Sequence, residues 1–159
     1  MIILGIDPGT TTLGYAVLDR VSRDSFKVIT YGVIKTVPKQ DEHLKLAEIS
    51  KDLKIVIEKY KPNIMSIEKI FYNTNPKTVI TVSQARGVCL MYAGVYNLTV
   101  KEYTPLQVKN ALVGYGRAEK KQVQYMVTKM LNLKEVPKPD DAADALAIAV
   151  CAGLEYYKL

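Results

Sequence analysis

The stretch IILGIDPGTTTLGYAV, residues 2–17, joins two apolar runs through a short polar turn. The first run ends at Asp7, and Pro-Gly-Thr-Thr-Thr follows before the second run begins. This pattern predicts two strands connected by a tight turn. An aspartate before Pro-Gly is ordinary turn chemistry, but two functional interpretations also exist. The Thr/Gly turn could hold a phosphate, as in an ATPase, or the Asp7 carboxylate could be a metal ligand at the end of a buried strand.

The hydrophobic periodicity of the rest of the chain predicts an α/β protein. Three closely spaced strands predict an antiparallel meander. The apolar run IMSIE is typical of a buried parallel strand, and a right-handed crossover would place it beside the first strand. We therefore expect a five-stranded mixed sheet, with three meander strands and two parallel strands, flanked by helices on both faces. The expected strands are 2–7, 13–19, 26–36, 64–68 and 98–103, and the expected helices are about 41–60, 76–97, 105–113, 118–131 and 140–157.

The composition indicates one globular domain over residues 1–159, with 48% hydrophobic and 24% charged residues. No apolar stretch reaches the roughly 18 residues that a membrane span requires. The N-terminus lacks the basic region and cleavage site of a signal peptide, so we expect a cytoplasmic protein. Cys89 and Cys151 lie among small apolar residues and are expected to be reduced core residues. His43, the only histidine, lies in a polar segment and is expected to be solvated.

The net charge of +6 is unevenly distributed. Residues 101–138 contain eight Lys or Arg against three Glu, whereas residues 139–159 contain four acids against one Lys. A basic stretch beside an acidic cluster is consistent with a polyanion held near a metal site, although charged runs are most often solvated faces.

Three further carboxylates could join Asp7. Glu68 ends the expected fourth strand, and carboxyl ends of parallel strands meet at one edge of a sheet, where ligands bind. Asp141 and Asp144 lie three residues apart on one face of the last helix, among alanines that would let the helix approach the sheet closely. Asp140 follows Pro139 and is expected to be the N-cap.

Four converging carboxylates would repel one another unless cations neutralised them. Oxygen ligands suit Mg²⁺ or Mn²⁺, and the chain offers no Cys/His set for zinc. Two such ions about 4 Å apart can hold a phosphodiester, activate water and stabilise the leaving 3′ oxygen. The pattern therefore favours the second interpretation of Asp7, a metal ligand at the end of the first strand.

Five segments, in this order, resemble the RuvC family of Holliday junction resolvases. They are IILGIDPGTTTLGYAV (2–17), SIEKIFYNTN (66–75), SQARGV (83–88), VKNALVGYGRAEKKQVQ (108–124) and DDAADALAIA (140–149). The resemblance spans essentially the whole chain. It implies a ribonuclease H-like fold and a homodimeric crossover junction endodeoxyribonuclease that nicks two strands of a four-way DNA junction symmetrically. It also implies the RuvA-RuvB branch-migration complex as a partner.

The same resemblance assigns site residues. The catalytic acids and metal ligands would be Asp7, Glu68, Asp141 and Asp144, of which Asp141 would be the most replaceable, because some members have His there. The other residues implied for catalysis or DNA binding are Phe71, Arg86, Lys109 and Lys120.

Each of these assignments has an alternative. Phe71 could stack on junction bases or belong to the core. Lys109 and Lys120 could contact DNA phosphates or be ordinary surface lysines. Arg86 could contact a phosphate or form a salt bridge.

Two further questions concern assembly and function. The apolar helix around residues 79–96 could form the dimer interface or be buried against its own sheet. A ribonuclease H-like nuclease acting on RNA and an actin- or Hsp70-like ATPase are the competing functions, although the chain shows no second phosphate loop for the latter.

Overall fold

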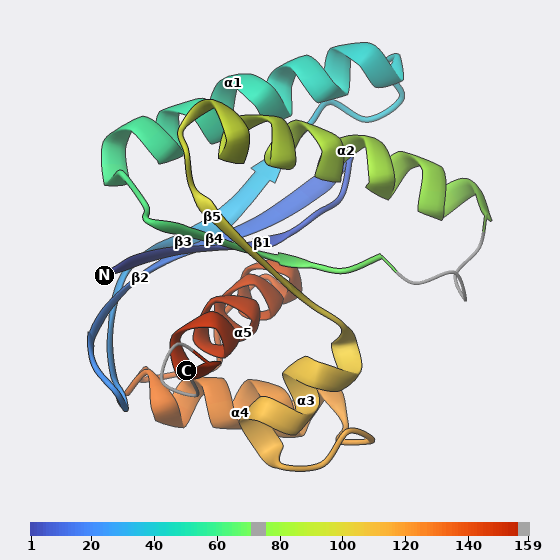
Figure 1. Cartoon of the computed structure of the whole chain (residues 1–159). Coiled ribbons are helices and arrows are strands. Elements are labelled where there is room, and N and C mark those ends of the chain that lie inside the picture. The colour runs from blue at the N-terminus through green and yellow to red at the C-terminus, as the bar shows by residue number, and fades with distance from the viewer. Residues whose placement is uncertain (71–75, 156–159) are drawn as a thin grey trace.

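The computed structural model describes residues 1–70 and 76–155 and contains one five-stranded sheet (Figure 1). Its strand order is β3-β2-β1-β4-β5. The β1–β2 and β2–β3 pairs are antiparallel, whereas β1–β4 and β4–β5 are parallel. The expected mixed sheet, with 64–68 beside the first strand, is therefore confirmed. The strands are β1 (Ile2–Asp7), β2 (Thr12–Ser22), β3 (Ser25–Lys35), β4 (Ile64–Glu68) and β5 (Thr99–Tyr103).

Helices cover both faces of the sheet, as expected. Figure 1 shows α1 and α2 on one face and α3, α4 and α5 on the other. Each group of helices closes its own hydrophobic core, and apolar residues of β1 and β4 contribute alternately to the two cores because successive side chains of a strand point to opposite faces. The helices are α1 (Glu42–Tyr60), α2 (Pro76–Val95), α3 (Pro105–Val113), α4 (Lys120–Met130) and α5 (Asp140–Glu155).

Helix α5 lies unusually close to the sheet. A Cβ built on Gly5 of β1 would collide with the carbonyl of Ala145, and one built on Gly14 of β2 would collide with the carbonyl of Asp141. Glycine on the strands and alanine on the helix together permit this approach. Every residue of α5 from 142 to 153 except Asp144 is buried, so the position of the helix along the sheet is fixed by packing.

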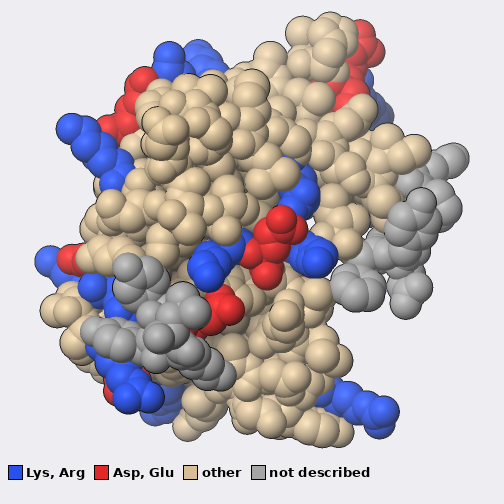
Figure 2. Space-filling view, viewed as in Figure 1, with Lys and Arg blue, Asp and Glu red and all other residues tan. Residues whose placement is uncertain are grey.

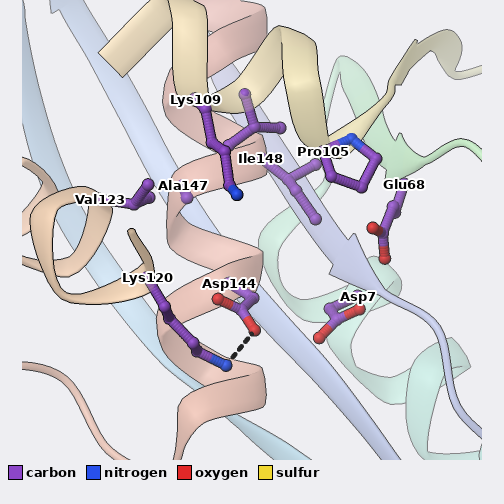
Figure 3. Close-up of a pocket in the computed structure, with 10 residues that line it drawn as sticks. Asp7, Glu68, Pro105, Lys109, Lys120, Val123, Asp144, Ala147 and Ile148 are labelled. Carbon is purple, nitrogen blue, oxygen red and sulfur yellow. Dashed lines mark hydrogen bonds and ion pairs between the residues drawn. The ribbon is translucent and has the colours of Figure 1, made fainter. Parts of the chain in front are cut away.

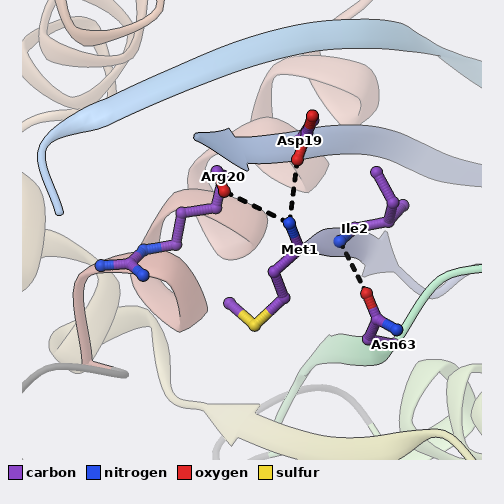
Figure 4. A network of polar contacts seen from close by, with 5 residues as sticks. All are labelled: Met1, Ile2, Asp19, Arg20 and Asn63. Atoms are coloured by element: carbon purple, nitrogen blue, oxygen red, sulfur yellow. Dashed lines mark hydrogen bonds and ion pairs between the residues drawn. The ribbon is translucent and has the colours of Figure 1, made fainter. Parts of the chain in front are cut away.

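The N-terminal end of β1 is held by polar contacts (Figure 4). The Met1 ammonium donates to Asp19 Oδ1 at 3.0 Å and to the Arg20 carbonyl, and the Ile2 amide donates to Asn63 Oδ1 at 2.8 Å. These contacts tie β1 to β2 and to the start of β4. They set the register of the strand whose other end carries Asp7.

The two cysteines and the histidine lie where the sequence predicts. Cys89 and Cys151 are free and buried, and burial raises the pKa of each thiol to about 12. His43 is exposed. No helix among the described residues is long and apolar enough to cross a membrane.

The expected N-cap at Asp140 is wrong. The carbonyl of Pro139 accepts from the amides of Ala142 and Ala143, so the residue before Asp140 is the cap and Asp140 lies in the first turn. Its carboxylate instead turns to Lys120 and Gln124 of α4. A tertiary ion pair has replaced the local capping hydrogen bond.

Candidate active site

The two strand-end acids are neighbours. Ile6 of β1 pairs with Ile67 of β4 in the parallel ladder, so Asp7 and Glu68 each follow one position later. Ile3 packs on the core beneath α5, and Ser66 donates to the Ile148 carbonyl of α5. Because side chains alternate along a strand, Asp7 and Glu68 point to this same α5 face.

Helix α5 brings the other acids to this edge. Asp144 lines the same cleft as Asp7 and Glu68. Asp141 lies one turn earlier, where its backbone carbonyl rests on Gly14 of β2, and it is half-buried. It does not line the cleft itself, but its charge acts on Asp7. The structure thus brings all four acids to one edge of the sheet, from β1, β4 and α5.

The cleft is lined by three acids, two lysines and apolar side chains (Figure 3). Its volume is about 260 Å³. In Figure 3 the carboxylates of Asp7, Glu68 and Asp144 face a common space, with Lys109 on one side and Lys120 on another. The lining residues are Asp7, Glu68, Pro105, Val108, Lys109, Lys120, Val123, Asp144, Ala147 and Ile148.

The acids destabilise one another as anions. Burial, followed by the charges of Glu68, Asp144 and Asp141, raises the pKa of Asp7 to about 8. Burial also raises the pKa of Glu68 and of Asp144. A group of carboxylates with these shifts is a typical feature of a functional site.

Lys120 already places one positive charge in the cluster. Its Nζ lies 2.9 Å from Asp144 Oδ2 and 3.2 Å from Asp140 Oδ2. Partial burial opposes the charged form, but the hydrogen bonds to both carboxylates raise the pKa of Lys120. The hydrogen bond from Lys120 correspondingly lowers the pKa of Asp140. Sequence reasoning missed this role of Asp140, because Lys120 lies 20 residues away and nothing in the sequence indicates the contact.

The donor set fits a hard divalent cation. Within residues 1–70 and 76–155, no three Asp, Glu, His or Cys side chains are already grouped closely enough to hold an ion. Nevertheless, the four acids offer only oxygen atoms, which suits Mg²⁺ or Mn²⁺. Burial and the neighbouring carboxylates raise the pKa values of Asp7, Glu68 and Asp144, and a bound cation would offset both effects.

Of the other residues expected to bind DNA, Lys109 lies at the cleft and Arg86 does not line it. Arg86 forms a salt bridge with Glu102 at 2.6 Å and donates from Nε to the Glu68 carbonyl at 3.3 Å. Phe71 lies outside the described residues.

Basic and acidic side chains are interleaved on the face seen in Figure 2, where an acidic group near the centre lies between basic ones.

Comparisons with known proteins agree with this site. The model of the family described as crossover junction endodeoxyribonuclease RuvC matches residues 3–152. A protein of that name from Syntrophomonas wolfei is 54% identical over 159 residues, covering 100% of this chain and 91% of the relative. Another from Alkaliphilus metalliredigens is 54% identical over 151 residues, covering 95% and 92%.

A solved structure of the same family has nearly the same fold as this chain. Thermus thermophilus RuvC in complex with Holliday junction substrate has a TM-score of 0.94 and 33% identity, and the match covers 99% of this chain and 96% of that one. The resemblance of the five segments is thereby confirmed, together with the ribonuclease H-like fold. The chain belongs to the crossover junction endodeoxyribonuclease RuvC family.

Proposed function

We propose that this protein resolves four-way DNA junctions by hydrolysing one phosphodiester bond in each of two opposed strands, using Asp7, Glu68, Asp141 and Asp144. The observation that carries the proposal is the acidic cleft where β1, β4 and α5 meet, with a lysine on either side. The Holliday junction bound to the Thermus thermophilus relative supports the choice of substrate.

Nucleases of this family depend on a divalent metal, and we propose Mg²⁺, with Mn²⁺ as a substitute and two ions in each site. Asp7, Glu68, Asp141 and Asp144 would hold them. When bound, such ions make water a better nucleophile and stabilise charge on the leaving 3′ oxygen. The raised pKa of Asp7 supports this arrangement, because a buried carboxylate group of this kind gains most from a cation.

The lysines supply fixed positive charge for the DNA backbone. Lys109 reaches the cleft from α3, and Lys120 reaches it from the first turn of α4. An ammonium beside a phosphate both attracts the DNA and stabilises negative charge that develops during hydrolysis. Val108, Val123 and Ile148 also line the cleft, and these apolar side chains lower the local dielectric and so strengthen the electrostatic interactions of the lysines.

Phe71 and Arg86 are the other two residues expected to bind DNA. We propose that Phe71 stacks on a base at the crossover, because an aromatic side chain three residues after Glu68 could hold an unstacked base near the acids. For Arg86 the expected phosphate contact competes with the ion pair to Glu102 that the structure contains. That ion pair supports a different role.

We further propose a homodimer that forms through the outer face of α2. The side chains of Ile80, Met91 and Val95 are 62%, 51% and 63% exposed, and, apart from the adjacent backbone of α2, no atom lies within 4 Å of the Cβ position of Gly87 or Gly94. These residues form an exposed stripe along α2. A two-fold axis at this stripe would relate the active sites of two protomers, as symmetric cleavage of opposed strands requires. The RuvA-RuvB complex as a partner and the cytoplasm as location follow from the family and are proposals of the same kind.

One cleavage assay separates this function from its alternatives. A four-way junction with differently labelled strands, a matched linear duplex and an RNA–DNA hybrid are each incubated with protein and Mg²⁺ or with EDTA. We expect paired nicks in opposed strands of the junction alone, and none with EDTA. Faster cleavage of the hybrid would indicate a ribonuclease, and nucleotide hydrolysis without any cleavage would indicate an ATPase.

A further inference from the structure

The backbone of Glu68 is held at the point where β4 ends. In the pairing with β5, the amide of Lys69 donates to the Tyr103 carbonyl at 2.8 Å. The carbonyl of Glu68 accepts instead from Arg86 Nε of α2, at 3.3 Å. The last residue of the strand is therefore fixed by a side chain of a helix that the chain reaches only later.

The guanidinium of Arg86 is itself held in place. Its Nη2 donates to Glu102 Oε2 at 2.6 Å, and the side chain is only 17% exposed. Glu102 lies in β5 directly opposite Ile67 of β4. Arg86 thus joins α2 to β4 and β5, at the carboxyl ends of these strands, where β4 carries Glu68.

The alternation of side chains places this contact away from the cleft. Tyr103 and Ser66 belong to the α5 face of the sheet, since Tyr103 donates to Glu155 and Ser66 donates to Ile148. Glu102, adjacent to Tyr103, therefore points to the α2 face. Arg86 donates to the backbone carbonyl of Glu68 from the α2 side of the sheet, whereas the Glu68 carboxylate points to the α5 side. The arginine does not compete for the carboxylate.

We propose that Arg86 and Glu102 are positioning residues that fix the end of β4 and thereby the Glu68 carboxylate. A strand end that lacks its hydrogen-bond partner frays, and a displacement of about 1 Å in a reacting group can cost about 100-fold in rate. The inference rests on the proposed function of Glu68. It differs from the expected phosphate contact of Arg86, because the guanidinium is already committed to protein partners.

The variants Arg86→Gln and Glu102→Gln separate the two roles. If Arg86 positions Glu68, both variants should bind the junction within about twofold of wild type and with an unchanged salt dependence. Both should lower the single-turnover cleavage rate by about tenfold or more. The double variant should cleave no more slowly than the worse single variant, because the two residues act as one unit. Lys54→Gln, which removes an exposed cation paired with Glu58 on α1, is the matched control for lost charge.

A phosphate contact predicts the opposite pattern. Glu102→Gln would free the guanidinium and strengthen binding, and Arg86→Gln would lower the salt slope by about one ion. Either result overturns the proposal, as does wild-type cleavage by both variants. If Arg86→Gln does not fold, Glu102→Gln still decides, because its carboxylate is at the surface (40% exposed).

A readout without DNA distinguishes failure of this inference from failure of the proposed function. The rise in melting temperature with Mn²⁺ reports binding at the acids. We expect both variants to need about threefold or more Mn²⁺ for half of the full rise, since one ligand is less well placed. Unchanged Mn²⁺ titrations would overturn the positioning role, whether or not the wild type cleaves a junction.

Discussion

Asp7 is the residue whose protonation should change most when metal binds. Its pKa in the folded protein is about 8, above the ordinary 3.8, so the metal-free fold favours the protonated form. The contribution of Asp7 is therefore most favourable below pH 4 and is lost as the pH rises towards 8. Metal-free protein should lose stability over this range.

The variant Asp7→Asn should remove that loss. We expect it to raise the free energy of unfolding of metal-free protein by at least about 1–2 kcal/mol at pH 8, the value of about one unit of pKa shift, and to change it little at pH 4. In a domain of this size the gain corresponds to at least about 2 °C in melting temperature. Calorimetry in EDTA at both pH values measures it, with the exposed Asp24→Asn as control. An equal shift at both pH values would argue against a raised pKa.

Lys109 and Phe71 should fail in different ways. Lys109→Ala should reduce the salt slope of junction binding by about one ion, because one phosphate contact is lost.

Phe71→Ala should leave the salt slope unchanged and lower cleavage of an intact junction, since a stacked aromatic is worth about 1–3 kcal/mol per base. Unpaired bases at the crossover should partly rescue Phe71→Ala. A large fall in its melting temperature without rescue would instead make Phe71 a core residue.

At the level of helices and strands, local pattern predicted the architecture well. The apolar runs that end in Asp7 and Glu68, and the alanines around Asp144, were sufficient to predict acids at neighbouring strand ends with a helix packed close to them. The role of Asp140 was not predictable, because capping is a local rule and the contact with Lys120 is tertiary. A salt bridge was one of the two alternatives expected for Arg86, but its partner Glu102 could not be identified for the same reason.

The close contact between β2 and α5 gives an element-scale prediction. Gly14→Ala would drive a methyl group into the Asp141 carbonyl, so α5 must shift and carry its acids with it. We expect a loss of about 1–3 kcal/mol in urea unfolding, and a fall in cleavage that persists at temperatures where the variant is fully folded. Gly32→Ala on β3 is the control, since its nearest neighbours are side-chain atoms of Tyr15 at 3.3–3.4 Å. Equal effects of the two variants would contradict this explanation.

For the molecule as a whole, the proposed homodimer predicts that symmetric cleavage depends on assembly. Met91→Lys places a charge on the exposed stripe of α2, and Ile55→Lys does the same on α1, where the side chain is similarly exposed (55%). Sedimentation should give twice the 17.8 kDa chain mass for wild type and Ile55→Lys, and a monomer for Met91→Lys. The monomer should lose paired nicking of opposed strands. A wild-type monomer at micromolar concentration, or a Met91→Lys dimer, would place the interface elsewhere or remove it.

The central claim is that the carboxylate cluster performs junction cleavage while other residues provide most of the affinity. Glu68→Gln tests it most directly, because the amide keeps the size of the side chain but loses the charge that would hold a metal. Cleavage and binding are measured in the same samples, with a labelled four-way junction in Mg²⁺. We expect cleavage to fall by about 100-fold or more, with junction affinity retained. A Glu68→Gln protein that cleaves the junction at the wild-type rate would contradict the site.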